Sequence, residues 1–168
     1  LVFKEELEIL KDPRVVASQE DLQAQFDLMV KIRDDLSTCN QIVAQARSIR
    51  SQINRWIKRG QHNQGFKTLT SLANQIDQKL TNIEETTVSI LGSNPQKPPP
   101  TRLIGKLLSL SSVVASADWV PTTQSYEVFS LVSDKVKEQS LLLKTIVEDD
   151  VASFVKIAED LGVNSLIG

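Results

Sequence analysis

The sequence contains very few of the residues that most enzyme and metal sites use. Its 168 residues include one cysteine and one histidine. A single cysteine excludes an internal disulfide and leaves the cellular compartment open, because cytosolic and exported proteins can both lack disulfides. A catalytic triad or a zinc site needs several partners at suitable spacing, and the residues around His62 supply none. We therefore expect His62 to be a solvent-exposed loop residue.

Long apolar runs and a strong charge of either sign are also missing. No apolar run approaches the ~20 residues that a membrane-spanning helix needs. The formal net charge is -2, and charged residues make up 24% of the chain. A balance of this kind is ordinary for a globular protein and gives no electrostatic reason to bind nucleic acid. We therefore expect neither a nucleic-acid partner nor a membrane span.

Glycine and proline are scarce, with six of each, and neither occurs between Ser18 and Arg59. Within that stretch apolar residues recur every seven positions, in two rows that lie three and four residues apart. The first row is Leu22, Met29, Leu36, Val43 and Ile57, the second is Ile32, Cys39, Ala46 and Ile53, and Phe26, Ile42, Ile49 and Trp56 widen the stripe. This pattern is typical of a helix in a bundle and predicts roughly 60 Å of uninterrupted helix.

Breaks in the pattern divide the rest of the chain into three further helices. We expect helices over 66–91, over 102–117, which is shorter, and from Thr122 or Thr123 to about Leu161. We expect the proline-rich segment 93–102 to be a linker, which we favour over a recognition motif for an SH3-like domain. Short connections between long helices imply antiparallel neighbours. The sequence predicts an all-α, up-and-down four-helix bundle with three long helices and one shorter, preceded by an extended N-terminal segment.

The N-terminal segment has a different character from the rest. Residues 5–11 alternate only roughly and are compatible with a strand, an extended lead-in or a short helix. Pro13 favours extended geometry at the residue before it, and Ser18 with Asp21 forms a capping-box pattern at the start of the first helix. We expect residues 1–16 to be an extended lead-in, the remnant of a preceding β domain, and residues 17–168 to form the bundle. A chain that begins with Leu1 in mid-pattern is expected to be part of a longer protein.

Candidate catalytic groups all have a simpler structural interpretation. Cys39 lies in a core row and is expected to be an apolar filler rather than a nucleophile. Adjacent carboxylates at 84–85, 148–150 and 159–160 point in different directions on a helix, so none is a facing pair by itself. Asp150 falls on an apolar heptad row, and Arg50 interrupts the row of the first helix. We expect these two residues to form a buried polar pair, in preference to a catalytic role for Asp150.

Positive charge is concentrated between Leu36 and Ile76, where the sequence has no acidic residue. The sequence predicts a basic interaction surface formed by Arg47, Arg55, Lys58 and Arg59 together with Trp56. Trp56 in this setting is able to stack on a base or a sugar. We favour the alternative of a core tryptophan at a helix end whose cations match the helix dipole. The glycines in this part of the chain lack the Lys-Ser/Thr of a phosphate-binding loop, and we expect no cofactor and no metal.

Several short motifs resemble a known family. They are "DPRV", "S..DL..Q.DL" and "IRD.LS" within residues 12–37, "ADWVPT" at 117–122 and "FVKIAEDLGV" at 154–163. Together they resemble the helical C-terminal region of bacterial sortilin-like β-propeller proteins with BNR repeats, which are often labelled glycosyl-hydrolase-like. In that family a propeller and a small β-sandwich precede the helices, and the last strand of the sandwich runs through a "DPR" turn into the bundle. The resemblance implies an extracytoplasmic or secreted, non-catalytic module, since any hydrolase site would lie in the propeller.

Three functions remain open at this level. The first is a non-catalytic structural or protein-interaction module at the C-terminus of a larger exported protein, with the β-propeller and β-sandwich domains of the parent polypeptide, or another protein, as partner. The second is a stand-alone four-helix binding, adaptor or sensor domain. The third is an enzyme fragment with a carboxylate site between helices. We favour the first and expect the chain not to be an enzyme.

Overall fold

The fold is a bundle of helices. The computed structural model describes residues 4–6, 8, 10–60, 65–88 and 102–162, and it contains no strand in these ranges. The elements are α1 (Gln19–Gly60), α2 (Phe66–Thr87), α3 (Leu103–Val114), α4 (Thr123–Thr145), the π-helix η1 (Ile146–Val151) and α5 (Ala152–Asp160). The last three follow one another without a break, so they form one long rod. The predicted all-α bundle of three long helices and one shorter helix is confirmed.

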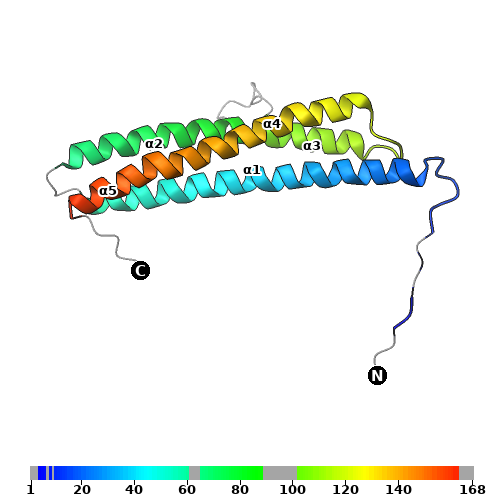
Figure 1. Cartoon of the computed structure of the whole chain (residues 1–168), viewed down its shortest axis with the longest axis horizontal. Helices are drawn as coiled ribbons and strands as arrows, with labels where there is room; N and C mark the ends of the chain where they lie inside the picture. The colour runs from blue at the N-terminus through cyan, green and yellow to red at the C-terminus, as the bar shows by residue number, and fades with distance from the viewer. Residues whose placement is uncertain (1–3, 7, 9, 61–64, 89–101, 163–168) are drawn as a thin grey trace, which may run out of the picture.

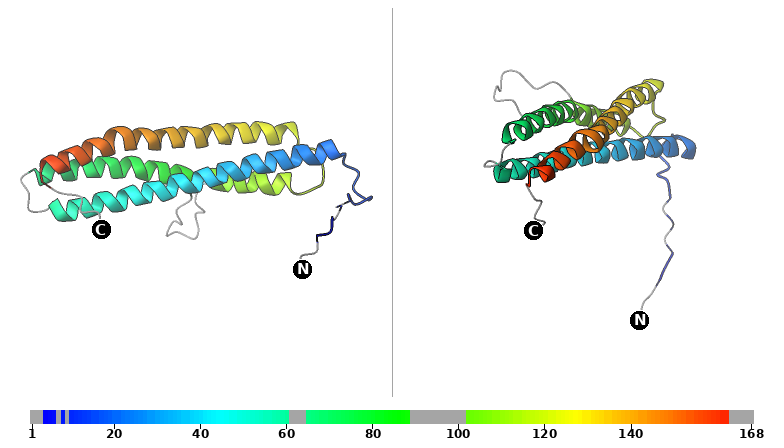
Figure 2. Two further views of the ribbon diagram at one scale, coloured as in Figure 1. Left: turned by 60° about the horizontal axis from the view of Figure 1, so that its bottom comes forward. Right: turned by 60° about the vertical axis from the view of Figure 1, so that its left-hand side comes forward.

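The helices do not all run side by side along the full length of the molecule. α1 and the α4–η1–α5 rod extend from end to end, whereas α2 and α3 lie one after the other along them (Figures 1 and 2). The third position of the bundle is thus shared between two shorter helices. As a result, a cross-section of the molecule contains mainly three packed helices, with α2 in one half and α3 in the other.

Each half has its own hydrophobic core. The core of the α3 half contains Leu28, Ile32, Cys39, Leu103, Leu107, Leu110, Val114, Val132 and Val136. The core of the α2 half contains Ile42, Ala46, Ile53, Leu69, Ala73, Ile76, Leu80, Ile83, Leu143, Ile146, Phe154 and Ala158. Two buried polar residues mark the boundary between the cores. Thr87 follows the last core residue of α2, and Gln139 lies on α4 between residues of the two cores.

One predicted core position is wrong. Phe26 was expected in the apolar stripe of α1, but it is 61% exposed, whereas Leu28 is 1% exposed. Phe26 and Leu28 are two positions apart, which places them about 200° apart around a helix, so both cannot face the same core. α3 and α4 pack on the side of Leu28 and Ile32, and this leaves Phe26 on the outside.

The capping box at the start of α1 forms as predicted. The backbone N–H of Asp21 donates to Ser18 Oγ at 3.0 Å, and the backbone N–H of Ser18 donates to Asp21 Oδ2 at 3.0 Å. These two bonds satisfy N–H groups that an uncapped helix end leaves without a partner. At the other predicted start, Thr122 caps α4, since the N–H of Ser125 donates to Thr122 Oγ1 at 3.2 Å.

We predict that Ser18→Ala lowers the free energy of unfolding by about 1 kcal/mol, the usual effect of losing a side-chain N-cap. Urea denaturation followed by circular dichroism measures the change. Ser37→Ala is the matched control, because Ser37 is an exposed serine inside α1. An equal loss of stability in both variants would contradict a capping role for Ser18.

The lead-in joins the bundle through a tight turn. The N–H of Val15 donates to the carbonyl of Asp12 at 3.0 Å, and the guanidinium of Arg14 pairs with the Asp12 carboxylate at 2.7 Å. Lys11 Nζ donates to the carbonyl of Ala17, which is buried. The strand considered at 5–11 is not formed by the residues described there, and the division at residue 16 stays a prediction. His62, residues 93–101 of the predicted linker and the tail 163–168 lie outside the described residues.

Candidate functional site

A polar cluster joins α1 to α2 in the half of the bundle that contains α2. Asp77, Thr81 and Glu84 are four and three residues apart, so they share the face of α2 that meets α1. Arg50 donates to Glu84 Oε2 at 2.6 Å, to Thr81 Oγ1 at 3.0 Å and to Asp77 Oδ1. Arg47 Nε donates to Glu84 Oε1 at 2.8 Å. Each oxygen of the buried Glu84 carboxylate is thus held by a different arginine.

The electrostatics of this cluster favour the charged forms. Burial opposes ionisation of Glu84, but hydrogen bonds from Arg50 and Arg47 and their positive charges outweigh it and lower the pKa of Glu84 below its usual range. Burial likewise disfavours the charged form of Arg50, yet the bonds to Glu84 and Asp77 raise the pKa of its guanidinium. A carboxylate held ionised between two arginines is a structural ion pair and a poor proton donor at neutral pH.

This pKa gives a pH-dependent prediction. A carboxyl group whose pKa is lower in the folded than in the unfolded protein stabilises the fold above its unfolded pKa, and the contribution disappears as the pH falls through the folded pKa. We expect Glu84→Gln to be less stable than the wild type at pH 7, and the difference to shrink below about pH 4.5, the ordinary value for the group. Urea denaturation at a series of pH values measures it. Glu85→Gln is the control, and a difference that does not change with pH would contradict the prediction.

The predicted pair of Arg50 with Asp150 is corrected by the structure. Arg50 has its partners on α2, and Asp150 pairs with Lys79, whose Nζ lies 2.8 Å from Oδ1 and 2.7 Å from Oδ2. Asp150 belongs to η1, where π-helical hydrogen bonds change the number of residues per turn. The heptad row that placed Asp150 in the core assumed a regular α-helix, so it does not continue past Ile146. α2 separates the two predicted partners by supplying a counter-ion to each.

The predicted cations on α1 gather around a shallow depression, which we call the basic groove. It is lined by Arg47, Arg50, Ser51, Asn54, Arg55 and Lys58 and has a volume of about 350 Å³. Arg59 is also exposed on α1 but does not line it. The predicted participation of Trp56 is not found in the groove lining. Its ring packs edge to face against Phe154, with ring centroids 6.2 Å apart, as a partly buried core residue does.

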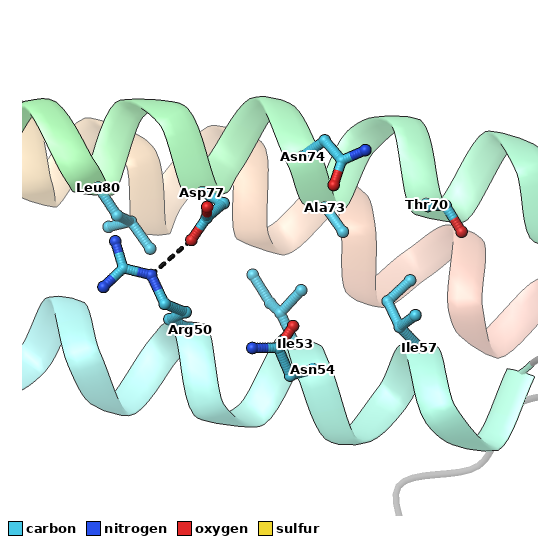
Figure 3. A pocket seen from close by; sticks show the side chains of 9 residues that line it. All are labelled: Arg50, Ile53, Asn54, Ile57, Thr70, Ala73, Asn74, Asp77 and Leu80. Carbon is cyan, nitrogen blue, oxygen red and sulfur yellow. Dashed lines mark hydrogen bonds and ion pairs between the residues drawn. The ribbon is translucent and has the colours of Figure 1, made fainter.

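A second pocket of about 270 Å³ adjoins the basic groove and lies between α1 and α2 (Figure 3). Arg50 and Asp77 are at one end of it, and Ile57 and Thr70 are at the other. Its walls are partly apolar, and Asp77 is the single carboxylate that lines it. The adjoining pocket therefore lacks the two facing carboxylates that acid–base hydrolysis of a glycoside requires.

The other candidate catalytic groups, the carboxylates on η1 and the thiol of Cys39, also lack partners for catalysis in the described part of the chain. A pocket between α1 and the α4–η1 segment is lined by one carboxylate, Glu148, and a pocket between α2 and the α4–η1 segment by one, Asp150. In the part of the chain that the structure describes, no three histidine, cysteine or acidic residues are grouped to hold a metal ion. Cys39 is fully buried, and burial, with the nearby Asp35 carboxylate, raises the pKa of its thiol to about 11. Such a thiol is protonated at neutral pH and a weak nucleophile.

Six exposed apolar residues belong to the elements that meet at one end of the molecule, which we call the apolar end, while others, such as Leu141 and Leu142, are exposed further along α4. The residues of the apolar end are Phe26, Val113, Trp119, Val120, Tyr126 and Val128, each at least 38% exposed. Val113 and Val128 line one groove between α3 and the start of α4, with a volume of about 400 Å³. Gln25 Nε2 donates to the carbonyl groups of Val114 and Ala117, so the first turns of α1 lie against the α3–α4 connection. Sequence periodicity gave no sign of this cluster, because loop residues and outward helix positions contribute to it.

The chain was compared with known proteins in three ways. Protein-family models, curated proteins and solved structures gave no match to the chain. Within the described residues, none of the helices is both long and apolar enough to pass through a lipid bilayer.

Proposed function

We propose that the chain is a non-catalytic helical module that docks through its apolar end onto a neighbouring domain of a larger, exported polypeptide. The observation that carries the proposal is the exposure of Phe26, Trp119 and four other apolar residues on the elements that meet at the end where the lead-in joins α1. Clusters of exposed large apolar residues on a protein surface mark interaction sites more often than scattered ones do. A domain attached through the lead-in would lie next to this end of the bundle, so we propose it as the partner.

The resemblance to the sortilin-like BNR family supplies the identity of that domain. In this proposal it is the β-sandwich that precedes the helices, and the chain is extracytoplasmic or secreted because the parent is exported. The tight turn at Asp12–Arg14 agrees with a "DPR" turn at the domain junction. A non-catalytic role is supported by the single carboxylate in each of three pockets between the described helices and by the buried, protonated thiol of Cys39.

Hydrogen–deuterium exchange tests the docking. The experiment compares the 168-residue chain with the natural polypeptide expressed from its complete reading frame. We expect slower exchange at the first turns of α1 and at residues 115–122 in the longer protein, and no change around Arg55 and Lys58. Unchanged exchange at 115–122, or a reading frame that places membrane-spanning segments on both sides of the chain, would contradict the proposal and favour a sensor domain. Glycosidase turnover by the purified chain would contradict the absence of catalysis.

A further inference from the structure

The end of the bundle opposite the apolar end carries unbalanced positive charge. The C-terminal part of α1 and the N-terminal part of α2 lie side by side there (Figure 1), and no acidic residue occurs between Leu36 and Ile76. α5 brings Glu159 and Asp160 to the same end. Among the described residues, however, no ion pair joins either of them to the cations of α1.

Some of these cations form ion pairs and others do not, as is true of the cations elsewhere in the described part of the chain. The exposed lysines of α4 have carboxylate partners about one turn away. These pairs are Lys135–Glu138 at 2.7 Å, Lys137–Asp134 at 3.1 Å and Lys144–Glu148 at 3.7 Å. Arg55 and Lys58 have no carboxylate partner in the described part of the chain. The helix dipole accounts for Lys58 in the last turn of α1, but Arg55 lies before that turn.

The basic groove already shows which group it prefers. Both of its arginines that have a partner bind carboxylates, Arg47 that of Glu84 and Arg50 those of Glu84 and Asp77. The side chain of Arg47 is 63% exposed, and a guanidinium has more N–H donors than its one bond to Glu84 uses. The groove therefore presents free donors beside arginines that are held in place by α2.

We propose that the basic groove binds an acidic segment of a partner polypeptide. From Arg47 to Lys58 the groove extends along roughly 16 Å of helix, the length of about five residues of extended chain. Arg47, Arg55 and Lys58 bind its carboxylates, and the exposed Ser51 and Asn54 between them offer hydrogen-bonding groups to its backbone. This surface lies roughly 40 Å along α1 from Phe26, so it is separate from the docking proposed for the apolar end.

A nucleic acid fits these observations less well. Single-stranded nucleic acid is bound by basic grooves with aromatic side chains on which bases stack. The aromatic residue nearest in sequence, Trp56, packs against Phe154 instead of lining the groove. Carboxylate recognition is the chemistry that remains.

Fluorescence anisotropy with fluorescein-labelled hexaglutamate tests the proposal at low ionic strength. We expect saturable binding that weakens as salt is added, and none to labelled hexaglutamine. Arg55→Gln/Lys58→Gln is expected to weaken binding about fivefold to tenfold, since each partly exposed ion pair contributes modestly. Lys135→Gln/Lys137→Gln is the matched control, because it removes the same charge from exposed helix positions. Its affinity should stay within twofold of the wild type.

Three results would overturn the proposal. They are the absence of saturable binding, an equal loss of affinity in both double variants, and tighter binding of a labelled 12-nucleotide single-stranded DNA than of hexaglutamate. Circular dichroism checks that both variants keep the fold. Failure here leaves the docking of the apolar end untouched, because that docking is measured at residues 115–122.

Discussion

Phe154→Ala is expected to lower the free energy of unfolding by about 4 kcal/mol, the largest effect we predict for a single substitution. Phe154 is 1% exposed and belongs to the core of the α2 half, where it packs against Trp56. Its removal leaves a cavity between α5 and α1 that the surrounding side chains fill only in part. Urea denaturation, followed by circular dichroism, measures the loss.

Phe26→Ala is the matched control for this prediction. Phe26 is the same residue type on α1 but is 61% exposed, so its replacement should change stability by about 0.5 kcal/mol or less. Equal losses in the two variants would mean that the α1 face described for Phe26 is buried in solution. A large loss for Phe26 alone would reverse the assignment of inside and outside on α1.

Glu84→Ala is expected to be the next most damaging change, at about 2 kcal/mol. It leaves Arg50 and Arg47 without their shared carboxylate and removes buried contacts between α1 and α2. The figure is below the usual range for a buried pair because Arg50 keeps Asp77 and Thr81 and its side chain is 27% exposed. The readout is the urea midpoint at pH 7.

Glu85→Ala and a double variant control this prediction. Glu85 is the neighbouring, exposed glutamate, and its replacement should have little effect. In an Arg50→Met background, Glu84→Ala should be less costly than in the wild type, since part of the loss comes from breaking the Arg50–Glu84 pair. Additive effects of the two substitutions would show that the Arg50–Glu84 pair does not contribute to stability.

The parts of the fold that were predictable from the sequence are those that local patterns specify. The capping box at Ser18 and the burial of Cys39, Ala46 and Ile53 depend on short-range spacing, and these predictions are confirmed. The position of α3 beyond the end of α2 depends on which helix each apolar face meets. A single sequence does not state that, because an apolar stripe fits several neighbours equally well.

The candidate site was only partly predictable for the same reason. The cations of the basic groove follow from composition along α1, whereas their carboxylate partners come from α2 and had no local signature. Asp150 was misplaced because a π-helix shifts the register of all later positions and the sequence pattern is too short to show it. The apolar end combines outward helix positions with a loop, so periodicity does not detect it.

The division of the third helical position between α2 and α3 bears on how the molecule bends and opens. Among the described residues, only α1 and the α4–η1–α5 rod cross the level between the two cores. We therefore expect the molecule to bend most easily between the two cores, where α1 connects the two halves. The halves are expected to open as separate cooperative units in hydrogen exchange. Strain applied at the apolar end would then reach the basic groove mainly along α1 and the rod.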